Sequence, residues 1–95
     1  MQLHITGRHF EVTQALKEFT EDKFKKLKHF YDAITQVNII FQVEHHDHIA
    51  AGTILSPGHE FHAEAKTIDM YQSVDELLEK LMTQIKKHKE QERDH

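Results

Sequence analysis

Hydrophobic and polar residues alternate in four short segments of the chain, a period of two that predicts β-strands. The segments are Gln2–Thr6, Val37–Glu44, Ile49–Leu55 and Glu60–Thr67. The second has the clearest alternation and is rich in β-branched residues, which favour strands. Gly7 ends the first segment, and Ser56-Pro57-Gly58 has the composition of a tight turn. The last two strands are therefore expected to form a hairpin.

Two longer segments repeat hydrophobic residues at helical spacing, which predicts α-helices. The first helix is expected from Thr13, whose hydroxyl can cap it, to about Tyr31. Its core candidates are Leu16, Phe19, Phe24, Leu27 and Phe30. Asp69 can cap the second helix, with Gln72 completing a variant of the capping box. The core candidates there are Met70, Val74, Leu77, Leu78, Leu81 and Ile85.

The order of these elements is β-α-β-β-β-α, without an internal repeat or a linker. This order predicts an α+β fold in which two helices pack on one face of a four-stranded sheet. The small residues Ala63 and Ala65 in the last strand indicate that a helix lies close against it. Residues 1–95 are expected to form a single domain, and the hydrophobic pattern decays so that about residues 90–95 are expected to fray.

Composition narrows the possible functions. The chain has no cysteine, which excludes a disulfide framework, a thiolate zinc site and a cysteine nucleophile, and which fits a reducing compartment. No apolar run approaches the roughly 20 residues that a membrane span needs, and the start lacks the features of a signal peptide, so a cytoplasmic protein without membrane contact is expected. The three glycines form no phosphate-binding loop and the acids are scattered, so neither an enzyme nor a cofactor or small-molecule substrate is expected.

The formal net charge of −4 is an argument against a nucleic-acid partner, but the lysines are not evenly distributed. On a helical wheel Lys23 falls inside the apolar arc of the first helix and Lys26 at its margin, so both must extend along apolar surface toward a neighbouring element. Lys80 and Lys87 lie about 20° apart on the second helix. The far face of that helix carries the acidic residues Asp75, Glu79 and Glu90.

If the two helices are neighbours, these lysines could line one groove and bind the phosphates of a shaped RNA. An alternative explanation applies to Lys25, Lys28 and Lys89, because cations near the C-terminal end of a helix complement its dipole and need no partner. Dipole complementarity does not explain why Lys23 and Lys26 lie along one edge of the first helix and Lys80 and Lys87 along one edge of the second. We therefore expect RNA contacts from the edges.

Ten histidines raise the question of a metal site, above all in His45-His46-Asp47-His48. In a strand or turn His46 and His48 point the same way while His45 opposes them, which leaves too few converging ligands for zinc, and no metal site is expected. His59 and His62 are interpreted as solvent-facing polar positions. Because histidine titrates near pH 6.5, the net charge becomes more positive in mild acid, and RNA affinity is expected to rise with it.

Several segments together resemble a known family. They are Met1–Gly7, Val12-Thr13, Lys23–Leu27, Val43-Glu44, Glu60–Ala63, Asp69-Met70-Tyr71 and Leu81–Lys89. In this order and without gaps, they resemble the short hibernation promoting factors of bacteria over essentially the whole chain. Among them Asp69-Met70-Tyr71 followed by a lysine-rich amphipathic helix is the most specific. Tyr71 either packs the first helical turn or presents its ring and hydroxyl at the edge of the domain.

The resemblance implies a β-α-β-β-β-α fold similar to a double-stranded-RNA-binding domain. It also implies binding between the head and body of the small ribosomal subunit, over the sites of messenger RNA and of A- and P-site transfer RNA. Members of this family inhibit translation in stationary phase, and the short form promotes ribosome dimers together with a separate ribosome modulation factor. The family's basic contacts with ribosomal RNA fall here on Lys23, Lys26, Lys80 and Lys87, with Lys86, Lys89 and Lys17 as further basic positions.

Two departures from the family pattern stand out. Thr83 occupies a position that is often arginine, and the segment His45–His48 differs from the usual loop. Within its 95 residues the chain has neither the dimerisation domain of the long form nor the acidic extension of the related inhibitor, protein Y, which favours the short form. The alternative function, from a different class, is a regulatory protein-binding module whose acidic helix face contacts a modulation or sigma-type partner.

Overall fold

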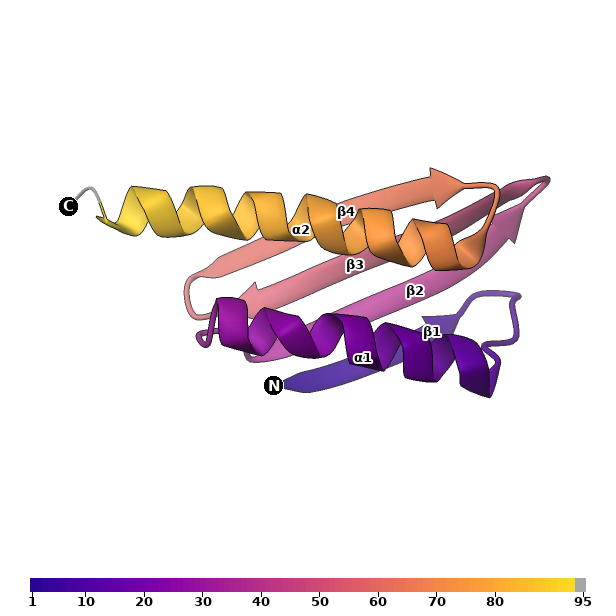
Figure 1. Ribbon diagram of the computed structural model, residues 1–95, viewed down its shortest axis with the longest axis horizontal. Coiled ribbons are helices and arrows are strands. Elements are labelled where there is room, and N and C mark those ends of the chain that lie inside the picture. The colour runs from indigo at the N-terminus through magenta and orange to yellow at the C-terminus, as the bar shows by residue number, and fades with distance from the viewer. Residues whose placement is uncertain (94–95) are drawn as a thin grey trace.

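The computed structural model describes residues 1–93 and contains the predicted elements in the predicted order (Figure 1). They are β1 (Gln2–Gly7), α1 (Gln14–Phe30), β2 (Gln36–Glu44), β3 (Asp47–Ser56), β4 (His59–Thr67) and α2 (Met70–Arg93). Both helices cover the same face of the sheet, which confirms the predicted fold class. Helix α2 continues through Arg93, while residues 94–95, the end of the segment expected to fray, lie outside the described residues.

The four strands form one sheet in the order β1-β2-β3-β4. Strand β1 runs parallel to β2, and α1 makes the crossover between them that a parallel pair requires. The other two pairs are antiparallel hairpins, of which the sequence predicted the one between β3 and β4. Ser56 pairs with His59 across the β3–β4 turn, where Gly58 has a φ of 75°, a conformation that glycine adopts at no steric cost.

A single hydrophobic core lies between the sheet and the two helices. On α1, Leu16, Phe24 and Leu27 are buried as predicted. Phe19 and Phe30 are only partly buried, because they lie on the edge of α1 that faces α2 and not over the sheet. All six core candidates of α2 are buried.

The strands beneath α2 carry small residues, so the helix approaches the sheet closely. Ala50, Ala63 and Ala65 are buried there, as the alanines of the last strand predicted. At Gly52 even a Cβ atom would lie only 3.1 Å from Leu77 Cδ2. The close approach of α2 to the sheet therefore depends on the small size of the residues below it.

Side-chain caps define where both helices begin. The Thr13 hydroxyl accepts a hydrogen bond from the Leu16 amide at 3.2 Å, and an Asp69 carboxylate oxygen accepts one from the Tyr71 amide at 3.1 Å. Both predicted caps are confirmed. The second half of the predicted capping box is wrong, because the Asp69 amide donates to the Thr67 hydroxyl at 3.1 Å.

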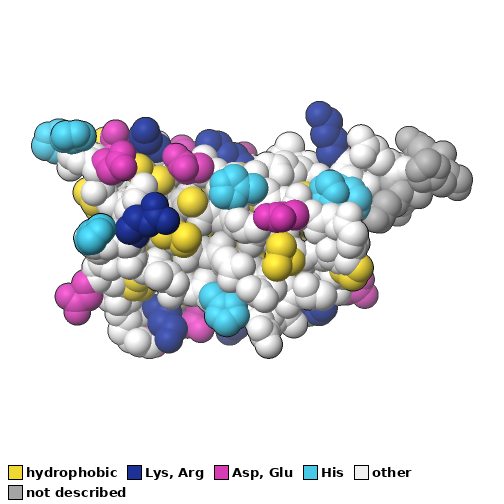
Figure 2. Space-filling model, turned by 180° about the vertical axis from the view of Figure 1, so that it is seen from behind, with side chains coloured by type: hydrophobic (Ala, Val, Ile, Leu, Met, Phe, Trp, Pro, Cys, Tyr) yellow, Lys and Arg dark blue, Asp and Glu magenta, His cyan; other side chains and the backbone are white. Residues whose placement is uncertain are grey.

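In the described chain the second face of the sheet has no helix over it (Figure 1). Figure 2 shows this face, on which histidines are spaced apart and the visible Lys and Arg side chains do not form a continuous patch. Within residues 1–93, no helix is long and apolar enough to cross a membrane.

Candidate nucleic-acid interface

Helices α1 and α2 lie side by side, and aromatic and charged side chains join them along a shared groove (Figure 1). Near the start of α2, the rings of Phe19 and Tyr71 meet edge to face with centroids 5.0 Å apart. One turn on, Lys23 Nζ lies 3.2 Å from Asp75 Oδ1 and 5.3 Å from the centroid of Phe19. Lys23 thus extends along apolar surface to the neighbouring helix, as the wheel predicted.

At the other end of the groove, Lys89 closes the C-terminal end of α1. Its ammonium donates to the Phe30 carbonyl oxygen at 2.7 Å and lies 4.7 Å from the centroid of the Phe30 ring. A cation at this position satisfies one of the carbonyls that a helix end leaves without an intrahelical partner. The predicted dipole explanation placed Lys89 at the end of its own helix, but α2 continues to Arg93 and Lys89 binds the end of α1, a contact that was not predicted.

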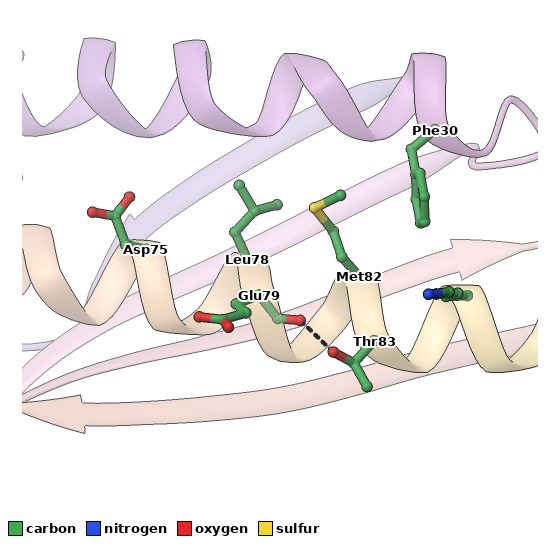
Figure 3. A pocket seen from close by; sticks show the side chains of 7 residues that line it. Phe30, Asp75, Leu78, Glu79, Met82 and Thr83 are labelled. Atoms are coloured by element: carbon green, nitrogen blue, oxygen red, sulfur yellow. Dashed lines mark hydrogen bonds between the residues drawn. The ribbon is translucent and has the colours of Figure 1, made fainter.

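Between these two ends the groove widens into a pocket with a volume of about 360 Å³. Figure 3 shows Phe30 extending from α1 toward α2, alongside Met82 and Leu78. The lining residues are Phe30, Asp75, Leu78, Glu79, Met82, Thr83 and Lys86. The Thr83 hydroxyl donates to the Glu79 backbone carbonyl at 3.0 Å. The pocket therefore combines an apolar floor with a rim that carries charges of both signs.

The second edge of α2 faces the outer strand of the sheet. Lys80 Nζ donates to the Glu64 carbonyl at 2.8 Å, and Gln84 Nε2 donates to the His62 carbonyl at 2.7 Å. These carbonyls belong to the free edge of β4, which would otherwise be open to pairing with another strand. Lys87 follows on the same edge about two turns later and is exposed.

The expectation that Lys23, Lys26, Lys80 and Lys87 line one groove is wrong. Lys23 and Lys26 lie on the edge of α1 toward α2, whereas Lys80 and Lys87 lie on the edge of α2 away from α1. The helices are neighbours as required, but a wheel does not tell which edge of α2 the neighbour faces. Lys17 is nine residues from Lys26, about 180° around α1, and lies on its opposite flank.

The predicted separation of charges along α2 also needs correction at Asp75. This residue faces α1 and forms the ion pair with Lys23, so it does not lie on a far face away from basic residues. Lys86 lines the pocket beside Glu79, and Lys89 and Glu90 line a smaller hollow next to it. Charges of both signs are therefore interspersed in the helix layer, where lysines lie on either side of an acidic ridge of α2 that includes Asp75 and Glu79.

Tyr71 both packs against the protein and is exposed at the edge of the domain, the two alternatives that the sequence left open. Its ring packs on Phe19, and 39% of the residue remains exposed at the edge of the helix layer. His62 is exposed as expected and hydrogen-bonds the Thr53 hydroxyl at 2.9 Å. His59 is exposed too, but it stacks on His88 at 4.2 Å, a contact that was not predicted.

The histidine-rich segment forms the β2–β3 turn. His45 adopts a φ of 57°, and His46 follows it in the turn, while His48 lies in β3. Among the described residues no group of three or more His, Cys, Asp or Glu side chains is placed to hold a metal ion.

Sequence reasoning named Lys86 as a site residue but missed the apolar residues of the pocket. Phe30 was assigned wholly to the core, and Met82 was not considered. A signal was present, since Leu78, Met82 and Lys86 follow one another at a spacing of four along one edge of α2.

Comparison with known proteins identifies a family model and relatives that match nearly the whole chain. A family model described as "Sigma 54 modulation protein / S30EA ribosomal protein" matches residues 3–93. The chain is 43% identical to the ribosome hibernation promoting factor of Escherichia coli strain K12 over 95 residues, which is 100% of both proteins. It is 40% identical to the factor of the same name from Pseudomonas putida over 92 residues, 97% of this chain and 90% of that protein.

Two solved structures have the same fold. A ribosomal subunit interface protein from Coxiella burnetii matches with a TM-score of 0.90 and 35% identity, covering 94% of this chain and 98% of that one. The N-terminal domain of Thermus thermophilus Protein Y matches with a TM-score of 0.83 and 23% identity, over 93% of this chain and 99% of that one. The second likeness is one of fold alone.

Proposed function

The chain belongs to the Sigma 54 modulation protein / S30EA ribosomal protein family, and we propose that it is a ribosome hibernation factor that binds the small ribosomal subunit. It occupies the channel of messenger RNA and transfer RNA and inhibits translation by occlusion, without catalysing a reaction. Together with a separate ribosome modulation factor it promotes inactive ribosome dimers. The observation that carries this proposal is the match to hibernation promoting factors over the full length of both chains.

The distribution of lysines supports the helix layer as the surface for ribosomal RNA. Lys26, beside the groove, and Lys87, on the outer edge of α2, are exposed and form no ion pair among the described side chains, so both are available to phosphates. Lys80 and Lys89 are held by backbone carbonyls, with the remaining donors of each ammonium unused by those bonds. On the open face of the sheet, the visible Lys and Arg side chains form no comparable set of cations (Figure 2).

Co-sedimentation with purified small subunits tests the proposal, measured over a series of salt concentrations. The wild-type protein should sediment with the subunit, and its affinity should fall steeply with salt. Replacing Lys26 and Lys87 together by alanine should lower the slope of log affinity against log salt by about 1.5, the share of two phosphate contacts. A matched control, Lys25→Ala with Lys66→Ala, removes the same charge from the outer side of α1 and from β4, and should retain most of the slope.

Failure of the wild-type protein to sediment with small subunits would refute the proposal. Equal losses in both double variants would instead mean that only net charge matters, which contradicts a defined RNA surface. An added messenger RNA and initiator transfer RNA should compete with the wild-type protein, because occlusion requires that the sites overlap.

The protein-binding alternative stays a second candidate because of the acidic ridge of α2. Glu76 and Glu79 stand on its outward side, near Lys80 and Thr83. A partner recognised there would be lost on Glu76→Gln with Glu79→Gln but retained in the lysine variants. Ribosome binding through phosphates predicts the reverse result.

A further inference from the structure

Helices α1 and α2 run in the same direction, so their N-terminal halves lie at one end of the helix layer and their C-terminal halves at the other (Figure 1). The contacts between the helices follow this order, from Phe19 with Tyr71 near the start to Phe30 with Lys89 near the end. A difference between the halves of the helices is therefore a difference between the two ends of one surface.

The two ends carry opposite charge. Residues 14–22 and 70–79, the acidic half, contain six carboxylates and a single lysine. The carboxylates are Glu18, Glu21, Asp22, Asp75, Glu76 and Glu79. Residues 23–30 and 80–91, the basic half, contain eight lysines and a single carboxylate, Glu90. A chain with a net charge of −4 thus collects most of its positive charge at one end of the helix layer.

Complementarity with the helix dipoles does not account for the carboxylates. The favourable effect of an acidic side chain falls off within the first turn of a helix, and neither α1 nor α2 has an acidic residue in its first turn. The ion pairs among the described residues, Asp22 with Lys25 and Asp75 with Lys23, each join a carboxylate of the acidic half to a lysine of the basic half. Glu76 and Glu79 form no ion pair with any described residue, so their charge is uncompensated.

A phosphate meets unlike surroundings at the two ends of the layer. Glu79 and Lys86 are seven residues apart on α2, which is about 10 Å along the helix axis. The Debye length at physiological ionic strength is about 8 Å, so the lysines do not cancel the field of the carboxylates. Figure 3 shows Asp75 and Glu79 at the side of the pocket away from Phe30. A phosphate is therefore attracted to the basic half and repelled by the acidic half.

We propose that the acidic half is a specificity element that confines RNA to the basic half of the helix layer. This inference rests on the proposed function, because it assumes that the helix layer binds ribosomal RNA. The carboxylates hold no ligand. They raise the free energy of every arrangement in which RNA extends over residues 14–22 or 70–79. Like charges placed in this way discriminate against wrong partners and wrong registers.

The arrangement has consequences for orientation and for specificity. Contacts with phosphates do not depend on sequence, so a groove that was basic throughout would accept RNA along its whole length. A groove that is basic at one end fixes which end of the protein faces the RNA. The carboxylates also lower the affinity for RNA that does not match this geometry, so the preference for the ribosome over unrelated RNA increases.

A single-stranded oligouridine is the probe, followed at low salt by NMR of the backbone amides. In the wild-type protein the shifts should be confined to residues 23–30 and 80–91. Glu76→Gln with Glu79→Gln should raise the affinity for oligouridine roughly threefold to tenfold and extend the shifts into residues 70–79. The matched control, Glu60→Gln with Glu64→Gln, removes the same charge from the open face of β4 and should change the affinity by less than about twofold.

Co-sedimentation with small subunits measures the effect on specificity. The variant with Glu76→Gln and Glu79→Gln should still sediment with the subunits, because the carboxylates bind nothing there. Added oligouridine should displace this variant at a roughly threefold to tenfold lower concentration than displaces the wild type. The control with Glu60→Gln and Glu64→Gln should behave as the wild type does.

Three results would overturn the inference. The first is a set of wild-type shifts spread evenly over both halves, or no shifts, in a protein that co-sediments with small subunits. The second is an equal change of oligouridine affinity in the two double variants, which would mean that only net charge acts. The third is loss of small-subunit binding on Glu76→Gln with Glu79→Gln, which would assign these carboxylates to a protein contact. A wild-type protein that does not co-sediment refutes the proposed function itself, so the two failures are distinguishable.

Discussion

Replacing Gly52 by alanine should destabilise the protein, because a methyl group at this position fits under α2 only if two leucines of the helix shift. A Cβ atom on Gly52 would stand 3.1 Å from Leu77 Cδ2 and 3.2 Å from Leu81 Cδ1. Favourable contacts between carbon atoms are about 3.5–4.0 Å long. Both leucines are fully buried, so they can move only by displacing other core residues.

The magnitude follows from two opposing terms. Overpacking a core costs about 1–3 kcal/mol, and the lower half applies because the atoms that must move are the ends of leucine side chains. Alanine in place of glycine in a strand returns roughly 0.5–1 kcal/mol. The net loss in free energy of unfolding for Gly52→Ala should be about 1 kcal/mol, which lowers the Tm by about 4–8 °C. Gly52→Val adds two methyl groups more than Gly52→Ala does and should cost about 3 kcal/mol.

Urea unfolding followed by far-ultraviolet circular dichroism measures both variants. Ala51→Val is the matched control, because Ala51 is the neighbouring residue on the open face of the sheet, with no helix over it. Its free energy of unfolding should change by no more than about 0.5 kcal/mol. A Gly52→Ala variant as stable as the wild type, or more stable, would show that α2 is free to move away from β3 and would refute the reasoning.

Three further predictions concern contacts around the helices. Thr13→Ala removes the acceptor for the Leu16 amide and should lower the free energy of unfolding by about 1 kcal/mol in urea unfolding, whereas Thr13→Ser should retain most of it. A double-mutant cycle of Lys23→Ala and Asp75→Ala should give a coupling below about 1 kcal/mol that shrinks with salt, because the side chains are 36% and 54% exposed; a larger, salt-independent value would contradict a solvent-screened pair. Lys89→Met keeps the aliphatic stem but loses the hydrogen bond to the end of α1, and should cost about 1 kcal/mol in thermal unfolding; an unchanged Tm would argue against this cap.

Local features of the fold could be predicted from the sequence, because they depend on residues close together in the chain. The Thr13 cap and the Pro57-Gly58 turn are of this kind, since each fixes a backbone conformation within a few residues. The burial of Ala63 and Ala65 was also predictable, because a strand that carries small side chains on one face leaves room for a helix. The membership of the family rested on motifs along the whole chain.

The arrangement of the site depended on information that periodicity does not contain. A wheel gives the angle of Asp75 or Lys80 about the axis of its own helix, but which edge meets the neighbouring helix depends on the path of the chain across the sheet. Asp75 therefore pairs with α1, and Lys80 binds the edge of β4. Phe30 lies in the stripe of core residues on the wheel, yet it lines the groove because it is on the edge of α1 that faces α2 and not over the sheet.

In a chain with a net charge of −4, the number of lysines does not by itself give the positive charge that is available to RNA. Lys23 is compensated by Asp75, so its contribution to RNA affinity should be the smallest of the helix-layer lysines. Lys80 and Lys89 use one of their three donors on a backbone carbonyl, which keeps their charge and holds the side chain in place. An ordered lysine loses less conformational entropy on meeting a phosphate than a free one does. Anchoring within the fold and binding to RNA are therefore compatible at these two positions, and they oppose each other only at Lys23.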